Sequence, residues 1–228
     1  MGKTTLLYNI LINRLVSKNE KVLLLSTNDN RKSIHSKLKK IIDGLENPTA
    51  INSENILISP QKINDPIVAK KFIEDTIKEH DIKAIYIDDI SELSYINEMY
   101  YYNDDDETFS DYSEYTPWNQ GIGIFLQFIK TTVNNYQIPL VLTEEISREM
   151  EQRSGLYRMP RISDMRSEKL ESIADKIYLL CRQAYYGITE DEEGNTTKGV
   201  MSVFVGKNKS GNARQTIELL INSNSLYK

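Results

Sequence analysis

The stretch GKTTLLYNILINRL, residues 2–15, decides how the rest of the chain is interpreted. It joins Gly2-Lys3-Thr4-Thr5 directly to apolar residues that recur at helical spacing, from Leu6 to Leu15. Small residues, a lysine and a hydroxyl at a helix N-terminus are the groups that bind nucleotide phosphates and Mg²⁺. The stretch therefore predicts that Gly2, Lys3, Thr4 and Thr5 bind a nucleotide, with Thr4 as a ligand of Mg²⁺.

Only the second half of a phosphate-binding loop is visible in this stretch. The complete motif starts with a strand and a Gly-x-x-x-x run that leads to the glycine of Gly-Lys-Thr. We expect the first strand of the sheet and the front of the loop to be missing, so that the chain is a fragment of a longer protein. On this motif alone, an arbitrary N-terminus explains Gly-Lys-Thr equally well.

Outward from residue 15, strand-like and helix-like stretches alternate. Apolar runs predict strands at residues 22–26, 55–59, 84–88 and 139–143, and helices are expected near residues 32–43, 66–80 and 121–136. From Lys176 onward only strand-like runs follow, at residues 177–181, 199–206 and 213–221, the last two joined by a turn. The pattern predicts an α/β fold with a mostly parallel central sheet flanked by helices and a C-terminal β-hairpin.

Composition is that of one ordinary domain of 228 residues, with 39% hydrophobic residues and a net charge of -5. The lone Cys181 excludes an internal disulfide and a cysteine-based metal site. The apolar stretch from Leu6 to Val16 is far shorter than the ~20 residues of a membrane span, and the first 25 residues do not form a signal peptide. We predict a cytoplasmic protein that does not contact membranes.

Two segments depart from this average charge. Residues 97–118, in a stretch without Lys or Arg, are rich in acids and tyrosines. They are interpreted as an acidic loop insertion, either a solvated surface or a segment that mimics DNA or binds a protein partner. Residues 148–166, here called the arginine loop, contain five arginines against three acids. The arginines predicted to bind the DNA backbone are Arg148, Arg153, Arg158, Arg161 and Arg166.

An apolar run that ends in a carboxylate suits the Mg²⁺ side of a phosphate site. Ile85-Tyr86-Ile87-Asp88 fits this description, and Asp88 is the predicted Mg²⁺-shell residue. The alternative is an ordinary core strand that leads into an acidic loop.

The C-terminal half carries the most specific pattern. It contains, in order, PLVLTEEISREMEQR at residues 139–153, Pro160, SDMR at residues 163–166, Ala174-Asp175, and GKNKSG at residues 206–211. With these segments the chain resembles, over nearly its whole length, the DnaB-type replicative helicases, whose motor is a RecA-like P-loop domain. The resemblance implies a single RecA-like ATPase domain over residues 1–228, acting as an ATP-dependent DNA helicase.

The same resemblance implies ATP and Mg²⁺ as cofactors. It also implies single-stranded DNA, a homo-oligomer that is a hexamer, and a primase or loader as partners. Residue by residue, Lys3, Thr4 and Asp88 match the phosphate and Mg²⁺ residues, and Arg148, Arg153 and Arg166 match arginines in and after the DNA loop. Lys207 and Lys209 match two basic hairpin residues that reach the neighbouring subunit's nucleotide, with Lys209 at the arginine-finger position.

Three predicted catalytic positions depart from the family pattern. Asn28 stands where the catalytic glutamate is expected, with Asp29 next to it, and an amide cannot accept a proton. Glu145 stands in place of a glutamine sensor, and Lys209 is a point charge in place of a planar guanidinium. The alternative function is therefore a degenerate RecA-like module that binds nucleotide or DNA with little hydrolysis, as scaffold or regulator. A nucleotide-dependent partitioning ATPase would need a second lysine upstream, which is not visible.

Overall fold

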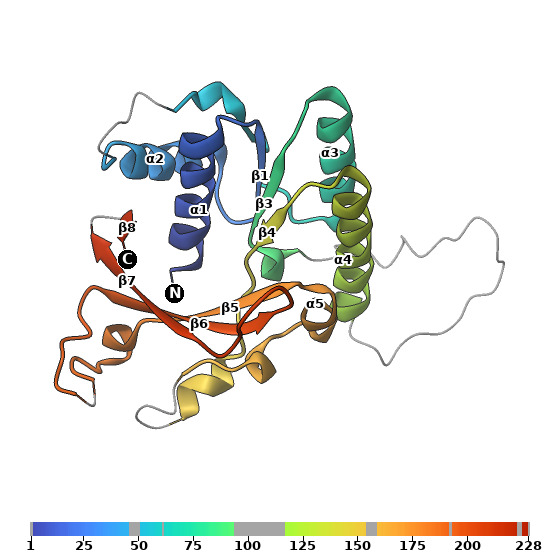
Figure 1. Ribbon diagram of the computed structural model, residues 1–228. Coiled ribbons are helices and arrows are strands. Elements are labelled where there is room, and N and C mark those ends of the chain that lie inside the picture. The colour runs from blue at the N-terminus through green and yellow to red at the C-terminus, as the bar shows by residue number, and fades with distance from the viewer. Residues whose placement is uncertain are drawn as a thin grey trace.

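A parallel sheet of four strands forms the first half of the protein. The structure is a computed structural model, and it describes residues 2–45, 51–60, 62–93, 117–153, 159–191, 193–222 and 225–227. The strands of this sheet are β1 (Val22–Ser26), β2 (Ile56–Ile58), β3 (Ala84–Asp88) and β4 (Leu140–Leu142) (Figure 1). They lie in the order β2-β1-β3-β4, and every pairing between them is parallel. The four predicted strands are confirmed, although β2 and β4 are shorter than predicted.

Helices cover both faces of this sheet, as Figure 1 shows. They are α1 (Lys3–Lys18), α2 (Arg31–Ile42), α3 (Pro66–Glu79) and α4 (Pro117–Tyr136). Alternate residues of a strand point to opposite faces, so Leu24 packs with α1 and α2 while Leu23 packs with α3 and α4. Because both faces are buried, the strands appear in the sequence as continuous apolar runs.

A second, antiparallel sheet follows in the order β5-β6-β7-β8. Its strands are β5 (Lys176–Cys181), β6 (Val200–Asn208), β7 (Thr216–Asn222) and β8 (Ser225–Tyr227). The predicted hairpin is confirmed as β6 and β7. β6 extends beyond its predicted end to Asn208 because its last residues pair with the start of β5. β8 was not predicted, since three residues are too few to show a period.

The connections contain one further helix and several short 3-10 turns. Helix α5 (Glu168–Ile173) packs against α4, and the 3-10 turns are η2 (Ser53–Asn55), η3 (Ile90–Glu92), η5 (Arg148–Gln152), η7 (Ile162–Asp164) and η8 (Gln183–Tyr186). Residues 97–116 of the predicted acidic insertion lie outside the described residues. Among the residues that the structure describes, none belongs to a helix with the length and apolarity needed to cross a membrane.

Candidate nucleotide-binding site

The carboxyl ends of the parallel strands meet the N-terminus of α1. We call this region the nucleotide edge. It is formed by Gly2, Lys3, Thr4, Asp88, Asp89, Thr143 and Glu145. Asp88 is the last residue of β3. Its side chain is hydrogen-bonded to Thr4 of α1, and its Oδ1 accepts a hydrogen bond of 2.9 Å from Oγ1 of Thr143, the residue after β4. Asp88 thus joins three elements at the edge where parallel sheets bind ligands.

Gly2, the N-cap residue of α1, has a backbone conformation that favours glycine. Its φ is 97°, and a Cβ atom there would lie 2.8 Å from Sδ of Met201 in β6. No side chain caps this helix, whereas Asn30 caps α2 and Asp65 caps α3. The first-turn N–H groups of α1, which include those of Thr4 and Thr5, are therefore arranged as an anion-binding helix N-terminus.

Lys3 forms ion pairs with two carboxylates. Its Nζ lies 2.7 Å from Oδ2 of Asp89 and 3.6 Å from Oε1 of Glu145. Glu145 also lies 3.8 Å from Nη2 of Arg166, the last residue of the arginine loop. The negative charge introduced by Glu145 is therefore compensated by two cations of the same chain.

Burial makes two carboxyl groups here easier to protonate. It raises the pKa of Asp88, an effect that hydrogen bonds from Thr4 and Thr143 only partly oppose. Burial also raises the pKa of Glu144 to about 7, and the charge of Asp89 adds to this shift. Both oxygens of Glu144 are shielded from solvent, and a hydrogen bond from the Ser167 backbone and the charge of Arg166 only partly oppose the shift, so this side chain is poised to hold a proton near neutral pH.

The predicted catalytic position carries no usable base. Asn28 follows β1 and is exposed. The neighbouring Asp29 accepts a hydrogen bond of 2.8 Å from Ser33 and forms an ion pair with Lys37. Burial raises the pKa of Asp29, but the hydrogen bonds from Lys37 and Ser33 outweigh it and leave the pKa below its ordinary value. A carboxylate paired in this way is a weak base.

The arginine loop contains arginines in two different settings. Arg148, in η5, and Arg161, at the start of η7, are exposed. Arg153 instead contacts the buried carboxylate of Asp164 through both terminal nitrogens, one at 3.0 Å, and Asp164 also accepts a hydrogen bond from the backbone of Arg161. Arg153 therefore shapes the loop from within, while Arg148 and Arg161 face solvent; Arg158 lies outside the described residues.

The hairpin cations contact a different part of the chain. Nζ of Lys207 donates to the backbone carbonyl of Glu171 at 2.6 Å, in α5, and Nζ of Lys209 lies 2.8 Å from Oδ1 of Asp175. Asp175 also pairs with Lys130 at 3.1 Å. The hydrogen bonds from Lys209 and Lys130 lower the pKa of Asp175. The structure thus brings Lys3, Thr4, Asp88 and Glu145 together and holds Lys207 and Lys209 at α5.

Four residues of this region were missed in the sequence: Thr27, Asp89, Thr143 and Glu144. Asp89 directly follows the predicted Asp88, and Thr143-Glu144 lies inside the quoted segment 139–153, so two acids at a strand end were a usable signal. Thr27 carried no such signal. Its hydroxyl acts through the backbone of Asp89, donating to the carbonyl at 2.7 Å and accepting from the N–H at 3.0 Å.

The chemistry of Thr4 and Asp88 suits Mg²⁺. Among the described residues, no group of three or more His, Cys, Asp or Glu is placed to hold a metal ion. Mg²⁺ does not need one, because it is commonly bound by one or two protein oxygens together with phosphate and water oxygens. The hydrogen-bonded hydroxyl and carboxylate supply such a pair.

Comparison with protein families finds one match that spans nearly the whole chain. The model of the DnaB-like helicase C terminal domain matches residues 1–226. A structure of a DnaB-like replicative helicase, described with its interactions with primase, is similar with a TM-score of 0.73 and 18% identity, over 99% of this chain and 54% of that one. A second solved structure, that of an ATPase domain, is similar with a TM-score of 0.73 and 17% identity, over 99% of this chain and 80% of that one.

At these identities the structural likeness shows the fold, and it confirms the predicted RecA-like architecture. The chain spans about half the length of the first of these structures. A search of curated proteins finds no match.

Proposed function

The chain belongs to the family of DnaB-like helicase C-terminal domains, and from this premise we propose that it is the motor domain of a hexameric, replicative-type DNA helicase. In this proposal it couples ATP hydrolysis to movement on single-stranded DNA. The observation that carries the proposal is the convergence of Lys3, Thr4 and Asp88 at the carboxyl edge of a parallel sheet.

The nucleotide edge supplies the contacts expected from the second half of a phosphate-binding loop and from the Mg²⁺ side of the site. The N–H groups at the start of α1 and the ammonium of Lys3 bind the phosphate oxygens. Thr4 and Asp88 hold Mg²⁺, which neutralises charge on the transferring phosphoryl group. Asp88 is buried and its pKa is raised, so a bound dication is a favourable counter-charge for it.

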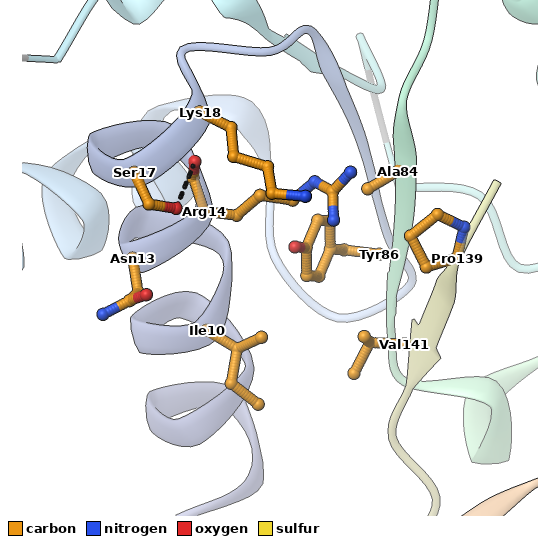
Figure 2. Close-up of a pocket in the computed structure, with 9 residues that line it drawn as sticks. All are labelled: Ile10, Asn13, Arg14, Ser17, Lys18, Ala84, Tyr86, Pro139 and Val141. Carbon is orange, nitrogen blue, oxygen red and sulfur yellow. Dashed lines mark hydrogen bonds between the residues drawn. The ribbon is translucent and has the colours of Figure 1, made fainter.

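The sheet edges favour one further strand, which we propose precedes Gly2 in the complete protein. In the described residues, β4 pairs with β3 alone and β5 pairs with β6 alone. Beside β4 lies a cavity of about 260 Å³ between α1 and the strands. Figure 2 shows Ile10 of α1 and Val141 of β4 at this cavity, which is also lined by Asn13, Arg14, Ser17, Lys18, Ala84, Tyr86 and Pro139. An apolar strand here hydrogen-bonds to an open sheet edge and leads directly into Gly2.

The remaining charged elements are assigned to DNA and to the neighbouring subunit. Exposed Arg148 and Arg161, with Arg166, face the DNA backbone. The side chain of Lys209 is 51% exposed, and in the ring it approaches the neighbour's phosphates. Lys207, in β6 of the same hairpin, donates to the carbonyl of Glu171 in α5 and so ties the hairpin to that helix.

One observation favours the second candidate, a RecA-like module that binds nucleotide and assembles but hardly hydrolyses. Asn28 is an amide, and Asp29 is already paired with Lys37 and Ser33. Neither residue offers a free carboxylate to orient the attacking water.

Hydrolysis of ATP with and without a single-stranded oligonucleotide tests the proposal. The protein is compared with its Lys3→Ala variant, which keeps α1 but lacks the phosphate-binding ammonium. Turnover that rises with DNA and is lost in the variant supports the motor. ATP binding without turnover supports the second candidate, and no binding at all contradicts both.

A further inference from the structure

The ammonium of Lys3 has a carboxylate partner that lies deep in the protein. Its distance to Oδ2 of Asp89 is 2.7 Å, and the Asp89 side chain is only 4% exposed, against 24% for Lys3. An ion pair that is partly withdrawn from water is stronger than one at the surface. Any phosphate that binds Lys3 therefore competes with Asp89.

Asp89 is fixed in this position by three hydrogen bonds. Its backbone N–H donates to Oγ1 of Thr27 at 3.0 Å, and its carbonyl accepts from the same hydroxyl at 2.7 Å. Its Oδ1 accepts from the N–H of Ser91 at 2.7 Å, which leaves Oδ2 for Lys3. Asp89 is thus a preorganised partner that loses little freedom when it binds Lys3.

Glu145 is a second, weaker partner on the solvent side. It lies 3.6 Å from Nζ of Lys3, its side chain is 46% exposed, and it also faces Arg166 at 3.8 Å. Its backbone N–H donates to Oγ of Ser91 at 2.6 Å, so Ser91 connects the two acidic residues. Solvent screens this contact more than that of Asp89.

We propose that Asp89, assisted by Glu145, is an intramolecular competitor of phosphate for Lys3, an inference that rests on the proposed nucleotide site. Phosphate binding replaces a carboxylate at the ammonium and leaves the buried charge of Asp89 without its partner. A buried unpaired charge is costly, so the competitor weakens nucleotide binding. These two carboxylates are then inhibitory residues within the site.

The test is the dissociation constant of a non-hydrolysable ATP analogue with Mg²⁺, measured by calorimetry. Asp89→Asn removes the charge and keeps an oxygen for Ser91; we expect binding about 5- to 10-fold tighter, the range that a close, partly buried charge pair supports. Glu145→Gln should tighten binding about twofold because its contact is longer and exposed. Glu92→Gln is the matched control, because Glu92 is an exposed acid in η3, the 3-10 turn that Asp89 caps. This variant should leave the dissociation constant unchanged.

A second background separates competition from general electrostatics. When Asp89→Asn is added to Lys3→Ala, nucleotide binding should tighten only slightly, by the amount expected from removing a distant negative charge. The ammonium for which Asp89 competes is absent from this background. Unchanged or weaker binding by Asp89→Asn with an unaltered thermal midpoint overturns the inference. If Asp89→Asn does not fold, Glu145→Gln decides: unchanged or weaker binding by this variant overturns the inference. Failure of wild type and every variant to bind overturns the proposed nucleotide site itself.

Discussion

The nucleotide edge and the β6–β7 hairpin both carry lysines predicted for one nucleotide, but the fold holds these lysines in different ways. At the nucleotide edge, Lys3 meets Asp89 and Glu145, which come from the ends of two other strands. At the hairpin, Lys209 meets Asp175 and Lys207 meets the carbonyl of Glu171. The first region is assembled within one chain, whereas the second is proposed to act on the nucleotide of a neighbouring subunit.

This difference has a physical cause. The carboxyl ends of parallel strands and the N-terminus of the preceding helix meet at one edge by topology, so their side chains converge without a partner. A hairpin projects from its own sheet. Its lysines therefore form ion pairs and hydrogen bonds with the nearest carboxylates and carbonyls of the same chain. A lysine paired in this way must exchange partners before it can act on a phosphate.

Asp88→Asn is the strongest way to test the nucleotide edge. The change removes the charge that is proposed to hold Mg²⁺, so ATP hydrolysis should fall by about 100-fold or more. Because burial raises the pKa of Asp88, removing this carboxylate should leave the thermal midpoint unchanged or higher. Asp75→Asn, an exposed acid of α3, is the control; equal losses in both variants would contradict a specific role for Asp88.

Mixing experiments test the claim that the hairpin acts between subunits. Lys209→Ala should lower hydrolysis by about tenfold, since one cation at the transferring phosphoryl group is lost. Mixed with an excess of inactive Lys3→Ala protein, it should regain turnover, because some interfaces then combine an intact Lys3 with an intact Lys209. Lys209→Arg should retain activity. No regain on mixing would assign Lys209 to its own subunit and remove the contrast between the two regions.

The two settings in the arginine loop predict different outcomes for the same substitution. Arg148→Lys keeps the charge of an exposed arginine and should change neither the thermal midpoint nor single-stranded DNA binding by more than about twofold. Arg153→Lys keeps the same charge but loses the two-pronged contact with Asp164, so it should lower the thermal midpoint. Equal midpoints would show that the Arg153–Asp164 pair does not shape the loop.

The smallest effect is expected from Glu144→Gln. Burial raises the pKa of Glu144 from 4.5 to about 7, so the folded protein keeps a proton that the unfolded chain releases. Stability should therefore fall as the pH rises from about 4.5 to about 7 and stay level above it. Glu144→Gln removes this fall. The variant should gain on the order of 1 kcal/mol at pH 8 after allowance for solvent screening, and nothing at pH 4.

Thermal midpoints measured from pH 4 to pH 8 check this expectation. Glu149→Gln, an exposed acid of η5, should keep the wild-type profile. A wild-type slope in the Glu144→Gln variant would show that another group carries the pH dependence.

Much of the first region could be predicted from local signals. Residues 22–26 and 84–88 form strands because a five-residue apolar run has few other low-energy choices once both faces of a sheet are buried. Lys3, Thr4 and Asp88 were recognisable because their residue types match the chemistry of phosphate and Mg²⁺. Asp89 was overlooked because nothing in a pair of adjacent aspartates says which side chain faces a lysine 86 positions earlier in the chain.

The contacts of the arginine loop and of the hairpin were less predictable. Arg148 and Arg153 look alike in the sequence, yet only Arg153 finds a buried carboxylate, 11 residues away. The partner of Lys209 lies 34 residues earlier, across β5 and β6. The Lys209 contact depends on the register of β5 and β6, and the Arg153 contact depends on how the loop folds back on itself; local composition encodes neither.

By itself, the sequence determined the α/β class, the positions of seven of the strands and the residue types available at the nucleotide edge. Periodicity and motif chemistry are local properties, so they can be interpreted without coordinates. Only the tertiary structure decided that Lys3 contacts Asp89, that Arg153 supports its own loop, and that Lys209 lies against Asp175. Those contacts join residues far apart in the chain, and their energies depend on distance and burial, which exist only in the folded molecule.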